Sequence, residues 1–216
     1  MKTDRCRAAV LISGSGSNLQ AFIDQVSSRE LALELVQVVS NRSDAFGLSR
    51  AVDAGIATRC LPHGDYASRQ AFDQALARTL DDVQPDLLIL AGFMRILSPW
   101  FVARYSGRIL NIHPALLPAY PGLNTHQRVL DAGERWHGST VHFVTEQLDG
   151  GPGILQGRLP VAAGETAAEL ACRVQAVEHR IYPAAAAMFA SGRLEYRAGS
   201  AWLDGERLQR PIVRDF

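Results

Sequence analysis

Short apolar runs alternate with amphipathic segments along most of the chain. The apolar runs, typical of buried strands, cover residues 8–12, 33–40, 57–61, 87–90, 109–112, 140–145 and 154–161. Helical periodicity, in which apolar side chains recur on one face, covers residues 18–27, 45–54, 68–83, 125–132 and 166–190. Apolar strands that alternate with helices are typical of a mostly parallel, twisted sheet with helices on both faces. We therefore predict an α/β fold built on such a sheet.

Local signals refine the ends of these elements. Ser98 followed by Pro99 is the start signal of a further short helix. The run 87–90 is the most apolar, so we place it near the centre of the sheet. A hairpin pattern follows the last helix at 194–203, whereas the tail 209–216 shows no interpretable pattern.

Composition and charge narrow the function classes. The 216 residues contain 22 Lys and Arg against 22 Asp and Glu, so no net charge favours nucleic acid or an anionic membrane. The three cysteines show no CxxC spacing and indicate free thiols in a reducing compartment. Residues 1–5 lack the apolar stretch of a signal peptide, and no apolar segment is long enough to span a membrane. We expect a cytoplasmic protein, compatible with a monomer or a weak homodimer.

The loop after the first strand, SGSGSN at 13–18, is a candidate anion site. Its glycines let backbone N–H groups approach an anion, and the following helix adds partial positive charge. A full dinucleotide fingerprint would need glycine where the chain has Leu19, and the second strand ends in Ser40 and Asn41 rather than an acidic ribose ligand. A single phosphate therefore fits better than a pyrophosphate. The alternative is a plain glycine turn with Ser17 as the helix N-cap.

Asn111 and His113 are the strongest candidates for chemistry. They lie two positions apart at the end of an apolar strand, so both side chains point to the same face. A neutral amide donor beside a group that titrates near neutral pH suits a tetrahedral oxyanion and a proton transfer. Asp149, in a Gly- and Pro-rich run, is a candidate partner for the histidine, and the alternatives are a structural histidine and an ordinary turn aspartate.

Two further features leave alternatives open. The segment 92–97, after the central strand, either forms a slot for a flat heterocycle or packs the core. Gln175 and Glu178 lie one helical turn apart and either face the same cleft or are solvated.

A metal site is disfavoured. His126, His137 and His142 are the histidines that invite one, but the chain has no HExxH or CxxC pattern. His137 and His142 also differ in parity along a strand, which places them on opposite faces. We therefore expect no metal.

Four long stretches together carry a resemblance to a known family. They are LISGSGSNLQ at 11–20, AGFMRILSP at 91–99, NIHPALLPAYPG at 111–122 and VHFVTEQLDGGP at 141–152. In this order they resemble the phosphoribosylglycinamide formyltransferase family, folate-dependent enzymes of purine synthesis, in its bacterial single-domain form. The likeness runs from Val10 to about Leu208. It implies a Rossmann-like formyltransferase fold as one domain over 1–216, with a phosphoribosyl-binding half at about 1–105, a catalytic and folate-binding half at about 106–208, and a short C-terminal tail.

The resemblance also implies a reaction. The amine of glycinamide ribonucleotide attacks the formyl group of 10-formyl-tetrahydrofolate directly, without a covalent enzyme intermediate and without a metal. Asn111 and His113 then stabilise the oxyanion, and His113 is the general acid. Asp149 keeps His113 protonated and helps to move the amine proton through water.

Substrate contacts follow from the same resemblance. The residues implied for the ribonucleotide are Gly16, Ser17, Asn18 and Glu178, and those implied for the folate are Arg69, Met94, Arg95, Ile96, Leu97 and Asn111. The family fold implies a cis peptide bond before Pro118. The chain departs from the family pattern just after the proline loop, by which we mean residues 114–122. Asn124 stands there where relatives such as the enteric enzyme have a histidine.

Related enzymes share the catalytic residues, so other activities remain open. Methionyl-tRNA formyltransferase adds a C-terminal tRNA-binding domain, for which this chain ends too soon. Formyltetrahydrofolate deformylase, a hydrolase that uses water as acceptor, adds an N-terminal regulatory domain, for which the first strand begins too early. A non-catalytic nucleotide-binding module would leave Asn111, His113 and Asp149 unexplained.

Overall fold

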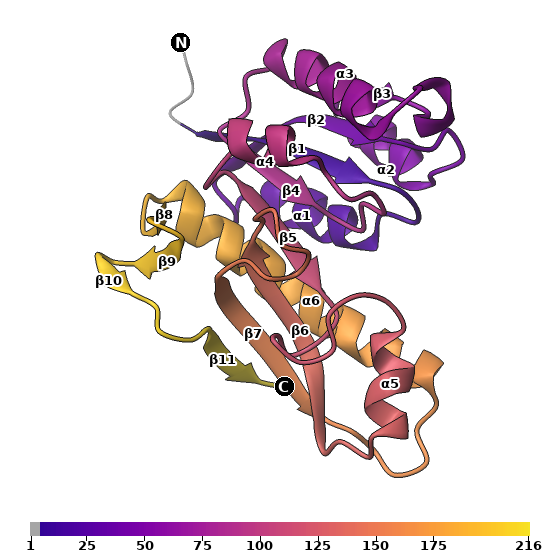
Figure 1. Cartoon of the computed structure of the whole chain (residues 1–216), viewed down its shortest axis with the longest axis vertical. Helices are drawn as coiled ribbons and strands as arrows, with labels where there is room; N and C mark the ends of the chain where they lie inside the picture. Colours follow the sequence, from indigo (N-terminus) through magenta and orange to yellow (C-terminus); the bar gives the residue numbers. More distant parts are fainter. Residues whose placement is uncertain (1–4) are drawn as a thin grey trace. The chain divides into compact units, whose positions relative to one another are not determined.

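A computed structural model describes residues 5–216 of the chain, and residues 1–4, with the predicted absence of a signal peptide there, lie outside the described part. The chain divides into two compact units, one that ends at Leu110 and one that spans Asn111–Phe216. Figure 1 draws the elements of each unit.

The N-terminal unit is built on parallel strands in the order β4-β1-β2-β3. Val10 in the middle of β1 lies opposite Val38 on one side and Ile89 on the other. The β1 side chains from Ala8 to Ile12 are fully buried, as expected for a strand covered on both faces. The strands are β1 (Cys6–Ile12), β2 (Leu33–Ser40), β3 (Thr58–Cys60) and β4 (Leu87–Leu90).

The helices of this unit cover the strands from opposite faces, with α1 on one side and α3 on the other (Figure 1). Their starts follow local chemistry, since the Ser68 hydroxyl accepts from the Ala71 amide and Ser98 caps a helix whose first residue is Pro99. They are α1 (Ser17–Ser27), α2 (Gly47–Asp53), the 3-10 turn η1 (His63–Asp65), α3 (Arg69–Asp81) and α4 (Pro99–Arg104).

The C-terminal unit has a mixed sheet in the order β11-β7-β6-β5 and a small antiparallel sheet, β10-β9-β8. β6 and β7 are antiparallel, whereas β11 runs parallel to β7. The strands are β5 (Ile109–His113), which starts just before the unit boundary, β6 (Trp136–Phe143), β7 (Gly153–Pro160), β8 (Leu194–Arg197), β9 (Ser200–Leu203), β10 (Glu206–Arg207) and β11 (Ile212–Asp215). The helices are α5 (Thr125–Asp131) and α6 (Ala167–Ala190).

The long helix α6 packs against β6 and β7. It begins with a capping box, in which Thr166 and Glu169 satisfy each other's backbone N–H groups. Contact with the sheet is close at Gly157, where an added Cβ would lie 2.2 Å from Val177 Cγ1.

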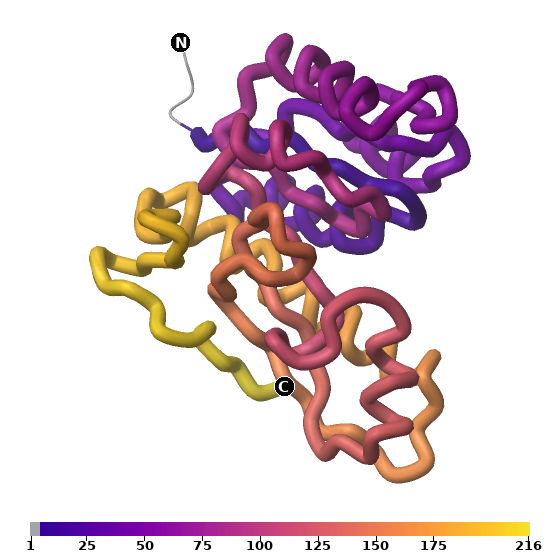
Figure 2. The backbone as a smooth tube through the Cα atoms, viewed as in Figure 1, coloured from indigo at the N-terminus to yellow at the C-terminus, as the bar shows by residue number. Residues whose placement is uncertain are grey.

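The predicted α/β class is confirmed, although β6 and β7 pair antiparallel and several element boundaries are shifted. β6 begins at Trp136 rather than residue 140, and the hairpin predicted at 194–203 is present as β8 and β9. The tail that showed no pattern forms the edge strand β11, and Figures 1 and 2 show this yellow segment running beside β7.

The Leu117–Pro118 bond is cis, as the resemblance implied. Within residues 5–216, none of the helices combines the length and the apolar composition needed to cross a membrane.

Candidate active site

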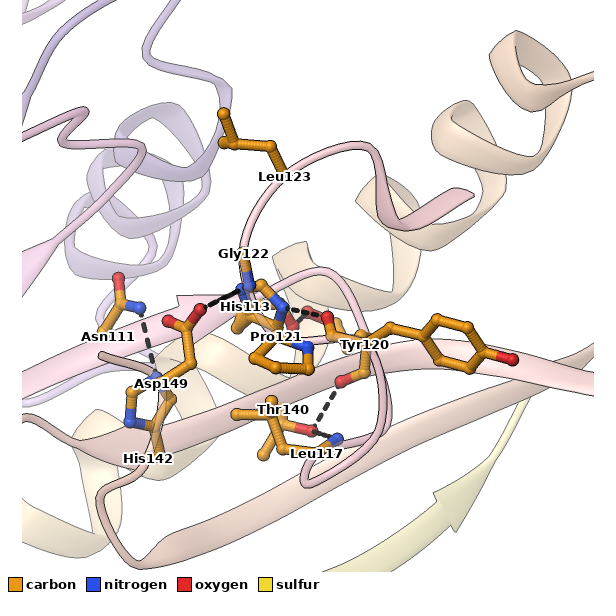
Figure 3. Close-up of polar contacts among 12 residues, drawn as sticks. Asn111, His113, Leu117, Tyr120, Pro121, Gly122, Leu123, Thr140, His142 and Asp149 are labelled. Carbon is orange, nitrogen blue, oxygen red and sulfur yellow. Dashed lines mark hydrogen bonds and ion pairs between the residues drawn. The ribbon is translucent and has the colours of Figure 1, made fainter. Parts of the chain in front are cut away.

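The site of the C-terminal unit is built at the end of β5. Asn111 and His113 alternate with the buried Ile112, so the two polar side chains emerge on one face of the strand. His113 is only 6% exposed, whereas Asn111 is half-buried. Figure 3 shows the Asp149 carboxylate beside the His113 ring, with the Asn111–His142 pair next to it.

Both ring nitrogens of His113 face oxygens. Nδ1 lies 3.5 Å from Asp149 Oδ2, and Nε2 lies 2.9 Å from the carbonyl oxygen of Tyr120. A carbonyl oxygen only accepts, so Nε2 carries a proton. In the imidazolium form both N–H groups therefore point at acceptors. The structure thus brings together the histidine and aspartate whose contact the sequence left open.

Asp149 is held in place from two sides. Its backbone has a positive φ of 51°, a left-handed conformation that aspartate adopts more readily than most residues. Its Oδ2 also accepts a 2.9 Å hydrogen bond from the Gly122 amide. Asp149 therefore links the proline loop to the loop before β7.

Asn111 is oriented by His142, a partner that sequence analysis did not assign. The Asn111 amide nitrogen lies 3.1 Å from His142 Nε2, and His142 Nδ1 lies 2.9 Å from the Phe143 carbonyl oxygen. The carbonyl requires a proton on Nδ1, and the amide donor requires a bare Nε2, so His142 is neutral. Burial, which lowers the pKa of His142, acts in the same direction.

Buried side chains from β6 and β7 hold the loop after β5. The Thr140 hydroxyl accepts from the Leu117 amide at 3.0 Å and donates to the Ala115 carbonyl at 2.6 Å. Gln156 donates to the Leu117 carbonyl at 2.7 Å. Sequence analysis missed Thr140 and Gln156 because a polar residue on a strand carries no sign of the loop it meets.

Glu178 is buried, not solvated. It is 7% exposed on α6, and its Oε1 lies 3.0 Å from the Ser139 hydroxyl. The same hydroxyl lies 2.7 Å from the carbonyl oxygen of His113. The solvated alternative for Glu178 is therefore wrong, and Ser139 connects this carboxyl group to the backbone of β5.

His126 and His137 form a pair of their own. His126 Nδ1 lies 3.0 Å from His137 Nε2, so one nitrogen donates and the other accepts. Burial is the main cause that lowers the pKa of both, that of His137 to about 4. Among residues 5–216, no group of three or more His, Cys, Asp or Glu side chains is arranged to hold a metal ion.

The glycine loop of the N-terminal unit has a specific backbone shape. Gly16, with φ of 70°, is the N-cap of α1, so the alternative that placed Ser17 at the N-cap is wrong. An added Cβ at Gly16 would lie 2.6 Å from the Gly47 Cα, and the Gly47 amide donates to Gly14 at 3.0 Å. The start of α2 therefore supports the loop that carries Gly16, Ser17 and the buried Asn18.

The segment after β4 is divided between the core and the surface. Met94 and Ile96 are 72% and 53% exposed, whereas Leu97 is buried. The Arg95 guanidinium stacks on the Phe72 ring at 4.6 Å. Part of this segment packs the core and part offers apolar surface. Arg69, the exposed first residue of α3, precedes Phe72 by three residues.

Comparisons with known proteins agree with these features. A family model described as Formyl transferase matches residues 6–186. The chain belongs to the formyl transferase family. This formyl transferase is 54% identical over 199 residues to phosphoribosylglycinamide formyltransferase of Escherichia coli (strain K12), covering 92% of this chain and 94% of that one. The resemblance read from the four stretches is confirmed.

Solved structures give the same result. The structure of phosphoribosylglycinamide formyltransferase from Coxiella burnetii is 48% identical, with a TM-score of 0.91 over 96% of this formyl transferase and 99% of that chain. A formyltetrahydrofolate deformylase from Pseudomonas syringae has a TM-score of 0.85 over 92% of this chain and 66% of its own, at 22% identity. At that identity the deformylase shares the fold alone.

Proposed function

We propose that this formyl transferase moves the formyl group of 10-formyl-tetrahydrofolate to the amine of glycinamide ribonucleotide, a step of de novo purine synthesis. The observation that carries the proposal is the arrangement of Asn111, His113 and Asp149 at the end of β5. An amide donor, an imidazole and a carboxylate lie together at the end of this strand, which suits acyl transfer. The similarity to the Escherichia coli and Coxiella burnetii enzymes supports the choice of substrates.

Each group has a defined part in the proposed reaction. The amine lone pair attacks the formyl carbon, a C–N bond forms, and the carbonyl oxygen becomes an oxyanion. One Asn111 N–H is used by His142, which leaves the other free to donate to this oxyanion. His113 Nδ1 lies 3.5 Å from Asp149 Oδ2, which is beyond normal hydrogen-bond length. Its N–H therefore donates to the same oxyanion.

Collapse of the tetrahedral intermediate completes the transfer. The bond between the formyl carbon and folate N10 breaks, and His113 gives a proton to the departing nitrogen. Asp149 accepts the amine proton through a water molecule, so one proton leaves the amine and one reaches the folate. Much of the rate comes from holding both substrates in reach of each other.

The substrate contacts are part of the same proposal. Gly16, Ser17 and Asn18 bind the phosphoribosyl end and Glu178 binds the ribose, while Arg69, Met94, Arg95, Ile96, Leu97 and Asn111 bind the folate. Backbone N–H groups at the start of α1 suit a single phosphate, and the exposed Met94 and Ile96 suit a flat ring.

Residues up to about 105 then form the phosphoribosyl-binding half of a single domain. The reaction needs no metal, and we propose that the protein acts in the cytoplasm as a monomer or weak homodimer.

The deciding experiment is a turnover assay with a 10-formyl-folate donor, followed by folate absorbance, with and without glycinamide ribonucleotide. Turnover that requires the ribonucleotide is the expected result. Equal turnover in its absence would make water the acceptor and the protein a deformylase. No turnover under either condition would leave a non-catalytic nucleotide-binding module. His113→Ala, prepared in parallel, controls for a contaminating enzyme.

A further inference from the structure

A buried hydroxyl connects two loops of the N-terminal unit. Ser13, at the end of β1, is 6% exposed, and its Oγ accepts a 2.8 Å hydrogen bond from the Met94 amide. The same Oγ lies 2.5 Å from Oδ1 of Asn41, which follows β2 and is 3% exposed. One serine therefore touches the segment after β4 and the residue after β2, and it begins the glycine loop itself.

The directions of these hydrogen bonds are fixed by chemistry. A backbone N–H only donates, so the Ser13 oxygen accepts from Met94. The single hydroxyl proton of Ser13 is then free for Asn41 Oδ1, which can only accept. This assigns the Asn41 amide, whose oxygen faces Ser13 and whose nitrogen faces His63 Nδ1 at 3.1 Å. The chain of contacts runs from Met94 through Ser13 to Asn41.

Asn41 is itself well anchored. The His63 amide donates to the Asn41 carbonyl at 3.3 Å, and the Leu61 amide donates to the Ser40 carbonyl at 2.8 Å. In dinucleotide-binding proteins, an acidic side chain at the end of the second strand binds a ribose. Here the residue after that strand is an amide whose oxygen and nitrogen both face protein partners, so Asn41 supports loops.

We propose that Ser13 and Asn41 are positioning residues that set the backbone of the 92–97 segment against the 13–18 loop. The inference rests on the proposed function, in which the first segment binds folate and the second binds the ribonucleotide. The Met94 N–H is the backbone group of the 92–97 segment that Ser13 binds. Loss of the hydroxyl would remove this acceptor and leave Asn41 Oδ1 without its donor, so both loops shift.

The test compares Ser13→Ala with a matched control, Ser40→Ala. Ser40 is a fully buried hydroxyl one residue before Asn41, and it bonds locally to Arg42. Each variant is titrated calorimetrically with a non-reactive 10-formyl-folate analogue and, separately, with glycinamide ribonucleotide. We expect Ser13→Ala to weaken analogue binding about tenfold and to lower kcat/KM by about 10- to 100-fold, because a small misplacement of substrate is costly. Ser40→Ala is expected to stay within about twofold of wild type in analogue affinity and in kcat/KM, since it leaves the hydrogen bond between Ser13 and Met94 intact.

Two further variants keep the test decisive. Ser13→Cys preserves the volume but replaces the oxygen by a weak acceptor, so it serves if the alanine variant does not fold. Asn41→Ala combined with Ser13→Ala should lose little more affinity than Ser13→Ala alone, because both act through one contact chain.

The outcomes separate this inference from the proposed function. Wild type without ribonucleotide-dependent turnover would refute the function. Normal turnover in wild type, together with wild-type analogue affinity in Ser13→Ala and Ser13→Cys, would refute the positioning role alone. An equal loss of affinity in Ser40→Ala would assign the effect to general destabilisation and would also overturn the proposal.

Discussion

At the scale of single residues, the proposed activity depends on the hydrogen-bond donors of Asn111 and His113. Asn111 and His113 supply the two donors proposed for the oxyanion, and both are anchored by a second partner. Loss of one oxyanion donor typically lowers turnover about 100- to 1,000-fold. We therefore expect Asn111→Ala and His113→Ala each to lose at least that factor in kcat.

Binding separates this effect from unfolding. The ribonucleotide contacts proposed here lie on other residues, so calorimetry should find glycinamide ribonucleotide bound by both variants with near wild-type affinity. Near-normal turnover in either variant would remove that residue from the mechanism.

His142 gives a second residue-scale prediction. It holds the Asn111 amide at 3.1 Å, so His142→Phe should free the amide to rotate and lower kcat, by about tenfold to 100-fold, with little change in KM. His137→Gln is the matched control, because His137 is equally buried on β6 but pairs with His126. Steady-state kinetics decide the matter, and equal kcat values for the two variants would contradict the orienting role of His142.

At the scale of elements, the contact between α6 and the sheet leaves no room at Gly157. An added Cβ would lie 2.2 Å from Val177 Cγ1 and 3.0 Å from Ile181 Cγ2. Overpacking of this kind costs about 1 to 3 kcal/mol, so Gly157→Ala should lower the free energy of unfolding by that amount. Gly64→Ala, whose Cβ meets nothing within 4 Å, is expected to change it by less than about 0.5 kcal/mol. Urea unfolding of both variants is the measurement, and similar midpoints would contradict the packing argument.

Elements with strong local signals were predictable from the sequence, and the exceptions have physical causes. The strand predicted at 33–40 is β2 itself, because leucine and valine fill five of its eight positions. The first half of β6 was missed because Gly138 and Ser139 weaken the strand pattern. Glycine is needed at position 138, since an added Cβ would lie 1.9 Å from the Gly157 carbonyl oxygen of β7. β11 was missed because a short charged edge strand is specified by its partner, β7.

The candidate site shows the same division. Spacing along one strand identified Asn111 and His113, and Asp149 was found as a candidate partner. Thr140 and His142 come from β6, which lies beside β5, and the antiparallel pairing of β6 with β7 places Gln156 opposite Thr140. The sequence pattern marked the 13–18 loop, the 92–97 segment and Glu178 as candidates, and the resemblance assigned the substrates to them and added Arg69.

At the scale of the whole molecule, stability should depend on pH through His126, His137 and His142. In the folded protein, burial is the main cause that lowers the pKa of His126, His137 and His142, that of His137 to about 4. In the unfolded chain these side chains return to the ordinary histidine pKa of about 6.5. Between about pH 4 and 6.5 the unfolded state therefore binds more protons, so stability falls as the pH falls through this window and is unaffected by these groups above it.

Urea unfolding followed by tryptophan fluorescence tests this dependence at pH 7, 6 and 5. We expect the midpoint to fall with each step, and His137→Gln to fall less steeply, because glutamine keeps a polar partner for His126 without a titrating ring. The exposed carboxylates of Asp44, Asp204 and Asp215, each beside an arginine that lowers its pKa, titrate below this window and do not contribute to it. Equal midpoints at pH 7 and pH 5 for the wild-type protein would contradict the proposed contribution of His126, His137 and His142 to the pH dependence of stability.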